Sequence, residues 1–431
     1  MLLSALLVVA GAAATPAPSL SSAEVQMVAN VDADRERSIA LLERLVNQNS
    51  GTMNLPGVAK VGAMMAEELR QLGFVVTWKP LPQTGRAGHL IAVHTGKGKG
   101  KRLLLIGHLD TVFEADSPFQ RFVRRQEEAS GPGAGDDKGG MVVMVAALRA
   151  MHRAGTLAPA HIEIVLTGDE EDSGDPIDVA RADLIAAGKR ADVALDFEGL
   201  AVEDGRDMGS IARRSVNDWS LVVKGRSGHS SRIFSSAFGD GAANEATRIL
   251  AAFRTELPEP NLTFNTGLLV AGVTATIDAT GSRATAQGKS NIIPAEAVAS
   301  GDFRTLSEEQ TVRVRAKMQA IVAHHLPGTE ATISFKSGYP AMAPTPGNRA
   351  LLDRLNRVNA DLGLPAMEPL DPLKRGAGDI SWVAADVDGL VGLGTASRGD
   401  HTPDEAVDLS SIQRQAKRAA ILMSRLGKDR R

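Results

Sequence analysis

The stretch between residues 103 and 140 constrains the fold of this chain more than any other. It begins with the run Leu103-Leu104-Leu105-Ile106, which is apolar on both faces and ends at Gly107. Such a run is typical of a buried strand in a parallel sheet. His108 and Asp110 follow directly, so we expect them at the carboxyl end of that strand, the edge where open α/β sheets bind ligands.

His108 and Asp110 are two residues apart, and side chains at this spacing leave an extended strand on the same face. Asp110 could therefore accept a proton from one imidazole nitrogen while the other nitrogen faces a metal ion. The alternative is a His and an Asp that only satisfy loop hydrogen bonds. The motif His-x-Asp alone does not decide between these two interpretations.

A glycine-rich loop follows, from Gly131 to Gly140. It is not a phosphate-binding P-loop, because Gly139 follows Lys138 where a Ser or Thr is required, and it fails the dinucleotide pattern because Asp136 takes the place of the third glycine. Adjacent Asp136 and Asp137 would repel a polyanion but suit a divalent cation. The loop therefore predicts a metal-bridging carboxylate.

Two later apolar runs also end in carboxylates. Residues 162–166 lead into Glu170 and Glu171, which could be a solvated acidic turn. Side chains of adjacent residues point in different directions, so one could bind a metal while the other carries a proton. The run that begins at Ala191 leads into Asp196 and Glu198, and the spacing does not choose between them.

Composition narrows the class of protein. The chain has 431 residues, 43% hydrophobic and 23% charged, with a formal net charge of -3, as expected of a globular protein of two or more domains. Neither charge nor motif indicates nucleic-acid binding. Cysteine is absent, so any metal must be held by nitrogen and oxygen ligands.

The first residues resemble a signal peptide, which we expect to span residues 1–20. The apolar run Leu2 to Ala14 ends in three alanines, although no Lys or Arg precedes it. It is too short to span a membrane, and no cysteine follows for a lipid anchor. The sequence thus predicts an exported protein, periplasmic or secreted, with no stable membrane anchor.

Strands and helices alternate along the chain, which predicts an α/β fold. We expect a catalytic domain with a mostly parallel, mixed sheet and helices on both faces, interrupted by a smaller α+β domain. The catalytic domain would comprise residues 22–214 and 339–431, and the insert residues 215–338. Within the insert, helices are expected at 241–253 and 307–324, and strands near 219–225, 265–273, 297–303 and 331–336.

The motifs together resemble a known family. Their order is Gly-His-Leu-Asp-Thr at 107–111, the loop at 131–140, Gly-Asp-Glu-Glu at 168–171, Phe-Glu-Gly at 197–199 and Gly-Asp-His-Thr-Pro-Asp-Glu at 399–405. It is similar to that of the di-zinc metallopeptidase family of glutamate carboxypeptidase, acetylornithine deacetylase and aminoacylase. The resemblance covers nearly the whole chain after the leader. It implies two Zn²⁺ ions per chain, for which Co²⁺ or Mn²⁺ could substitute.

The resemblance also implies roles for particular residues. Asp136 would bridge the two metals, and Asp137 is the alternative if the loop register differs. Glu170 would be the general base, and Asp110 would orient a metal ligand. The remaining ligands would be His108 and Glu198 on one ion and Glu171 and His401 on the other.

Substrate contacts are implied in the insert and in the returning part of the chain. His229 matches a histidine that contacts the substrate carbonyl oxygen, often from the partner subunit, and Arg304 could bind a substrate carboxylate. The alternatives are an exposed loop histidine and a surface ion pair of Arg304 with Asp302. The resemblance also implies a homodimer formed through the insert, and further substrate contacts at Asn291, Gly376 and Asp379.

The predicted function is zinc-dependent hydrolysis of peptide or amide bonds, of the carboxypeptidase or dipeptidase type. Substrates would be small peptides with a free carboxylate, attacked by a metal-bridging water that Glu170 activates. The alternative is an N-acyl-amino-acid deacylase. A non-catalytic binding relative is a third reading, against which the complete set of motif residues argues.

Overall fold

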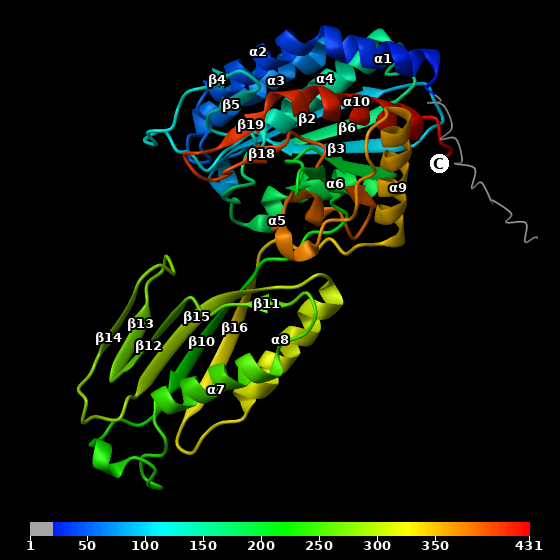
Figure 1. The fold of residues 1–431 in the computed structure, drawn as a ribbon. Helices are drawn as coiled ribbons and strands as arrows, with labels where there is room; N and C mark the ends of the chain where they lie inside the picture. The colour runs from blue at the N-terminus through cyan, green and yellow to red at the C-terminus, as the bar shows by residue number, and fades with distance from the viewer. Residues whose placement is uncertain (1–19) are drawn as a thin grey trace, which may run out of the picture.

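The computed structural model describes residues 20–431; the predicted leader, 1–20, lies outside the described residues except for its last position. A larger α/β domain and a smaller α+β domain are joined by two neighbouring chain segments (Figure 1). These segments pair, because Val216 N–H donates to Tyr339 O at 2.9 Å and Gly338 N–H to Val216 O at 3.0 Å. Between residues 20 and 431, no helix has the length and apolar character needed to cross a membrane.

A six-stranded sheet forms the centre of the larger domain. Counted in spatial order, its last four strands run parallel to one another, and its second strand is antiparallel to both of its neighbours. The strands in spatial order are β1 (Val75–Leu81), β2 (Arg86–Thr95), β6 (His161–Thr167), β3 (Arg102–His108), β7 (Val193–Asp196) and β17 (Gly389–Leu390).

Helices cover both faces of this sheet, as Figure 1 shows. Side chains of β3 alternate between the two faces: Leu103 and Leu105 enter the main core, whereas Leu104 and Ile106 enter a second core on the other face. The main core is covered by α1 (Ser22–Ala33), α2 (Arg35–Val46), α3 (Leu55–Gln71), α4 (Lys138–Arg153) and α10 (Leu409–Leu426). The second is covered by α6 (Ala182–Arg190), next to the short α5 (Ile177–Ala180).

A second, four-stranded sheet brings distant segments of the larger domain together. In spatial order its strands are β18 (Ser397–Arg398), β19 (Ala406–Asp408), β5 (Glu128–Ser130) and β4 (Val123–Arg125). The remaining elements are the hairpin of β8 (Val202–Glu203) with β9 (Arg206–Asp207), and α9 (Pro346–Asp361), which packs beside α10 and β17.

The smaller domain has an antiparallel sheet with two helices on one face (Figure 1). Its core includes Trp219, Phe253 and Phe303. Its strands are β10 (Asn217–Lys224), β11 (Thr263–Phe264), β12 (Leu268–Gly272), β15 (Glu296–Arg304) and β16 (Glu330–Ser337), with a separate hairpin of β13 (Thr274–Ile277) and β14 (Ala284–Gln287). The helices are α7 (Ala242–Glu256) and α8 (Glu308–Ala323).

The predicted fold class is confirmed: a mostly parallel, mixed sheet carries helices on both faces, and an α+β domain interrupts the chain. The insert runs from β10 at Asn217 to β16 at Ser337, within the predicted range 215–338. Helix α9 was not predicted, although its Leu351, Leu355 and Val358 are buried at helical spacing.

Candidate metal centre

Three parallel strands end at one edge of the main sheet, and each delivers candidate ligands there. His108 is the last residue of β3, and it pairs with Thr167 at the end of β6. On the other side of β3, Ile106 pairs with Asp196 at the end of β7. Motifs far apart in the sequence are therefore neighbours in space.

The carboxylate of Asp136 lies between two imidazoles. Its Oδ1 is 3.0 Å from His108 Nε2, and its Oδ2 is 3.0 Å from His401 Nε2. Glu171 completes the group, with Oε2 at 3.2 Å from His401 Nε2. Ligand atoms of His108, Asp136 and Glu171 all lie within 4.8 Å of one another.

The glycine-rich loop owes its shape to a carboxylate that it encloses. Glu405 is buried and accepts the backbone N–H groups of Gly135 at 2.8 Å, Asp136 at 3.2 Å and Gly133 at 3.3 Å. Gly133 has a φ of 73°, in the left-handed region that favours glycine. The N–H groups of this loop therefore bind a side chain of the same chain.

His401 reaches this loop because the four-stranded sheet places it there. The turn that carries it connects β18 to β19, and β19 pairs with β5 directly before the glycine-rich loop. Its backbone has a φ of 64°, which is strained for a residue other than glycine. Its side chain is 54% exposed, so it forms the open side of the cluster.

Asp110 organises two parts of the centre at once. Its Oδ1 lies 3.5 Å from His108 Nδ1, as expected of a carboxylate that orients a metal-ligating imidazole. Its two oxygens also accept the backbone N–H groups of Glu170 and Glu171, each at 3.1 Å, and Thr52 Oγ1 donates at 2.7 Å. His108 Nε2 is thereby left facing the cluster.

Glu170 lies next to this cluster, and its environment suits a proton carrier. Burial raises the pKa of its carboxyl well above the usual range, and the nearby carboxylates of Glu198 and Asp379 add to the shift. A general base works best when its pKa is near the working pH. Asp136 is the opposite case: burial would raise its pKa, but hydrogen bonds from His108 and His401 outweigh burial and hold the pKa well below its ordinary range.

The loop that carries Glu170 rests on a buried polar network. Tyr339 OH donates to Glu170 O at 2.9 Å and accepts from Arg181 Nη2 at 2.8 Å. Arg181 also binds Asp169 Oδ1 at 2.6 Å and lies 3.1 Å from Asp379 Oδ1. Asp379, at the start of a short 3₁₀ turn, accepts from Thr167 as well, so both of its oxygens face protein groups.

Glu198 and Asp196 differ in their partners. Glu198 Oε2 pairs with the buried Arg213, whereas its Oε1 is buried without a partner. Asp196 Oδ1 accepts the Glu198 backbone N–H at 3.0 Å, and its Oδ2, like Glu198 Oε1, is buried without a partner. Burial raises the pKa of Asp196 to about 8.

The donor set fits divalent metal ions. In the cluster, two imidazole nitrogens and the carboxylates of Asp136 and Glu171 supply the nitrogen and oxygen ligands that zinc accepts, while Glu198 is paired with Arg213. Glu171 Oε1 and Glu198 Oε1 are buried without hydrogen-bond partners, which is costly unless a cation is bound there. Asp137, the alternative bridging residue, accepts the backbone N–H of His108 with Oδ2 at 3.2 Å, while its Oδ1 is also buried without a partner.

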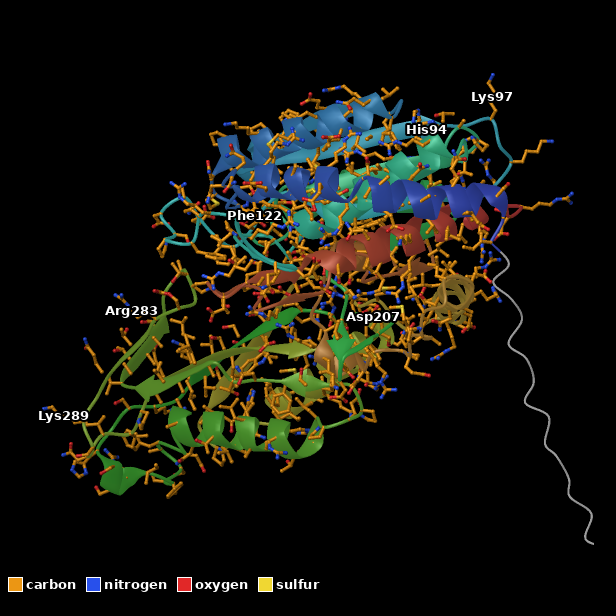
Figure 2. The ribbon with its side chains drawn as sticks, turned by 45° about the horizontal axis from the view of Figure 1, so that its top comes forward. His94, Lys97, Phe122, Asp207, Arg283 and Lys289 are labelled. Atoms are coloured by element: carbon orange, nitrogen blue, oxygen red, sulfur yellow. The ribbon has the colours of Figure 1, made fainter. Side chains whose placement is uncertain are left out.

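The residues predicted to contact substrate fall into two separate groups. Arg304 lies beside the loop of Gly376, because a Cβ atom on Gly376 would be 3.8 Å from Arg304 Nη1. His229 and Asn291 lie together elsewhere, since Asn291 O accepts the N–H that follows His229 at 2.9 Å. Lys289, two residues before Asn291, lies at the end of the insert remote from the larger domain (Figure 2).

Some residues of the centre were missed in the sequence. The sequence indicates Glu405 only as the last residue of a motif, and it gives no sign of a role for Tyr339, Arg213 or Arg181. Tyr339 is the only tyrosine of the chain, but that rarity does not indicate what the residue does. Each of these four residues has a partner 158 or more positions away, so local spacing does not reveal these contacts.

Known proteins match both the sequence and the fold. The model of Peptidase family M20/M25/M40 matches residues 104–425. Carboxypeptidase G2 of Pseudomonas sp. strain RS-16 is 28% identical over 403 residues, covering 90% of this chain and 89% of that protein. Succinyl-diaminopimelate desuccinylase of Novosphingobium aromaticivorans is 30% identical over 405 residues, covering 89% and 97%.

A solved structure shares the fold. The YXEP protein of Bacillus subtilis, described as a dinuclear metal-binding peptidase, superimposes with a TM-score of 0.61 at 16% identity and covers 91% of this chain and 98% of that one.

Proposed function

Because the chain belongs to peptidase family M20/M25/M40 and is a metallohydrolase that acts on amide bonds, we propose that it is a zinc-dependent carboxypeptidase or dipeptidase. Its substrates would be small peptides with a free carboxylate. The observation that carries the proposal is the position of Asp136, 3.0 Å from each of two imidazoles, beside the half-buried Glu170.

The metal ligands would be His108, Asp136, Glu171, Glu198 and His401, holding two Zn²⁺ ions, with Co²⁺ or Mn²⁺ as substitutes. Bound zinc would polarise the substrate carbonyl and lower the pKa of water. The chain itself supplies the proton transfers. Glu170 would take a proton from the attacking water and pass it to the leaving amine, and its raised pKa suits both steps.

Arg304 is the candidate for binding the free carboxylate of the substrate. It is about one third exposed, and its Nε donates to Asp302 Oδ2 at 3.2 Å, which leaves its other donors available. A guanidinium binds a carboxylate through two parallel hydrogen bonds. Its position beside Gly376 places it on the surface that connects the insert to the larger domain.

A homodimer would explain the position of His229. The segment of Asn291, which accepts the N–H that follows His229, adjoins Lys289 at the end of the insert remote from the larger domain (Figure 2). We propose that His229 and Asn291 reach the centre of a partner subunit, where His229 would stabilise the developing oxyanion. Sedimentation of the purified protein tests the dimer.

An N-acyl-amino-acid deacylase is the second candidate, because a desuccinylase is among the relatives. Both activities would use the same centre and the same base. They differ in the group on the acyl side of the cleaved bond.

The deciding experiment measures free-amine release from dipeptides and N-acyl amino acids, using protein stripped by a chelator and reloaded with zinc. We expect zinc to restore cleavage, and the compounds cleaved to separate peptidase from deacylase. Glu170→Gln should keep its metal and lose nearly all turnover, whereas Asp172→Asn, an exposed change in the same loop, should not. Normal activity of Glu170→Gln would disprove the role of Glu170.

Export remains a separate proposal. It rests on the apolar run from Leu2 to Ala14. Fractionation of cells that produce the full chain, with N-terminal sequencing of the mature protein, tests it.

A further inference from the structure

Basic side chains gather at the end of the larger domain opposite the metal centre. The loop between β2 and β3 supplies Lys97, Lys99 and Lys101, and the end of the chain supplies Lys428 and Arg430. We call these five residues the basic patch. Lys101 is half-buried and the other four are exposed. Figure 2 shows Lys97 directed away from the body of the molecule.

Backbone contacts join the two segments of the basic patch, which are distant in the sequence. Gly100 forms an antiparallel bridge with Arg430, and Arg431 Nε donates to Gly100 O at 3.0 Å from 331 positions away. The loop is also tied to the segment before β6, because Gly98 N–H donates to Pro159 O at 3.0 Å. The two segments therefore form one surface.

The positive charges of the basic patch are not neutralised by neighbouring side chains. Within residues 20–431, none of its five side chains forms an ion pair. The acidic side chains at this edge of the sheet already have partners: Asp192 pairs with Arg102 at 2.7 Å, Glu163 with Arg190 at 2.6 Å, and Asp429 with Arg354. The carboxylate of Arg431 would offset one charge. Since the formal net charge of the chain is -3, the patch is a local excess of positive charge.

Two exposed valines lie at the same edge of the sheet. Val75 and Val93 are direct partners across β1 and β2, so their side chains leave the sheet on the same face, and they are 73% and 38% exposed. Val93 also lines a hollow of about 190 Å³ together with Arg102, Ile162 and Arg190. Apolar groups beside unpaired cations suit the interface of a membrane, where anionic head groups cover acyl chains.

A nucleic acid is the other large anion to consider. Proteins that bind single strands stack the bases on aromatic side chains, and residues 95–102 and 427–431 contain none. Contacts to the phosphates of a duplex would leave Val75 and Val93 without a role. The combination of charge and apolar surface therefore favours a lipid surface over a nucleic acid.

We propose that the basic patch binds, reversibly, the surface of a membrane that contains anionic phospholipids. Strand β3 fixes the orientation, because it begins at this edge with Arg102 and ends in the metal centre with His108, roughly 20 Å away at about 3.3 Å per residue. In Figure 1 the C-terminus lies at one end of the larger domain, and β18 and β19 lie toward the other. A bound molecule would thus direct its metal centre away from the bilayer, whichever reaction the centre catalyses.

Sedimentation with lipid vesicles tests the basic patch. The full chain is mixed with vesicles of phosphatidylcholine, with or without phosphatidylglycerol. The apolar run at residues 2–14 would bind both kinds of vesicle alike, because hydrophobic transfer does not depend on the charge of the head group. The difference between the two therefore reports the patch. We expect tighter binding to the anionic vesicles, and loss of the difference between about 0.1 and 0.5 M NaCl, because salt screens the charges.

Two variants remove the charges of the patch from one segment at a time. Each basic side chain near an anionic surface contributes a factor of about five to binding. The triple variant Lys97→Gln, Lys99→Gln, Lys101→Gln should therefore bind anionic vesicles about 100-fold more weakly, and the double variant Lys428→Gln, Arg430→Gln about 25-fold more weakly.

The double variant Arg283→Gln, Lys289→Gln is the matched control. It also removes one arginine and one lysine, both exposed, but from the insert, far from Lys97 (Figure 2). Its binding should equal that of the parent. Equal binding of the parent to both kinds of vesicle would overturn the proposal, as would undiminished binding of the triple variant. Retention of the parent on double-stranded DNA without binding to anionic vesicles would overturn it too, and would assign the patch to a nucleic acid.

Discussion

Asp110 accepts the backbone N–H of Glu170 at 3.1 Å, so the residue predicted to orient a metal ligand also fixes the loop of the proposed base. The same carboxylate lies 3.5 Å from His108 Nδ1. Metal binding and base positioning therefore depend on one buried side chain.

Asp110→Asn should weaken both functions. An amide keeps one acceptor oxygen but loses the charge that holds His108 and the two N–H groups of the loop. We expect zinc affinity to fall about 10- to 100-fold, measured by competition with a chromogenic chelator. Asp172→Asn is the control, because Asp172 is 62% exposed and lies in the loop of the base. Unchanged affinity of Asp110→Asn would contradict the orienting role.

Glu405→Ala should loosen the loop that carries Asp136. Three N–H groups, those of the buried Gly133 and Gly135 and of the half-buried Asp136, would lose their acceptor. Each unsatisfied group costs about 1–3 kcal/mol, so we expect lower stability in urea and lower zinc content. Glu405→Gln retains one acceptor and should be intermediate. The neighbouring, exposed Asp404→Asn should resemble the parent in both measurements.

Tyr339→Phe should lower kcat without changing KM or zinc content. The phenyl ring keeps the contact with Trp382, at 5.6 Å between ring centroids, while the hydrogen bond to Glu170 O is lost. The expected loss is on the order of 1 kcal/mol, or several-fold in kcat. Ser173→Ala, which removes another neighbour of the hydroxyl, is the comparison. A lower melting temperature with normal kcat would assign Tyr339 a purely structural role.

Asp207→Asn should destabilise the larger domain in a pH-dependent manner. Asp207 accepts from Arg414 Nε at 2.9 Å and pairs with Arg418, which is 1% exposed. Burial would raise the pKa of Asp207, but these arginines outweigh it and lower the pKa below 3.8. The stabilisation is therefore fully present above that value and is lost as the pH falls through the lowered pKa.

Urea unfolding of the parent and of Asp207→Asn measures this effect. At pH 7 we expect a difference of roughly 3 kcal/mol, because Arg418 would remain buried without its carboxylate. The difference should shrink as the pH falls below 3.8. Asp32→Asn is the control, because Asp32 also pairs with a residue of α10, lying 2.6 Å from Lys417 Nζ, but is 55% exposed. This variant should lower the free energy of unfolding by less than about 1 kcal/mol. Equal losses in both variants would contradict the argument from burial.

Local patterns predict most of the sheet and its ligands. Leu103 to Ile106 is apolar on both faces because helices cover both, and this pattern can be read without a structure. His108, Glu171 and His401 follow from motifs. Contacts between distant segments do not follow from local patterns. Glu405 accepts the N–H of Gly135, 270 positions away, and nothing in its motif indicates that partner.

The insert shows the same limit. Its strands and helices follow from their spacing, and Arg304 could be singled out from its motif. That Arg304 of the insert approaches Gly376 of the larger domain depends on how the two domains meet. No periodicity within either domain contains that information.

His401 completes the cluster from 265 positions beyond Asp136, on the far side of the entire insert. During synthesis the ribosome must therefore translate through His401 before the centre can assemble. A nascent chain halted earlier would hold an incomplete set of ligands. Tight zinc retention would accordingly report that both halves of the larger domain have been made and joined, and loss of zinc would be an early sign of a chain cut short.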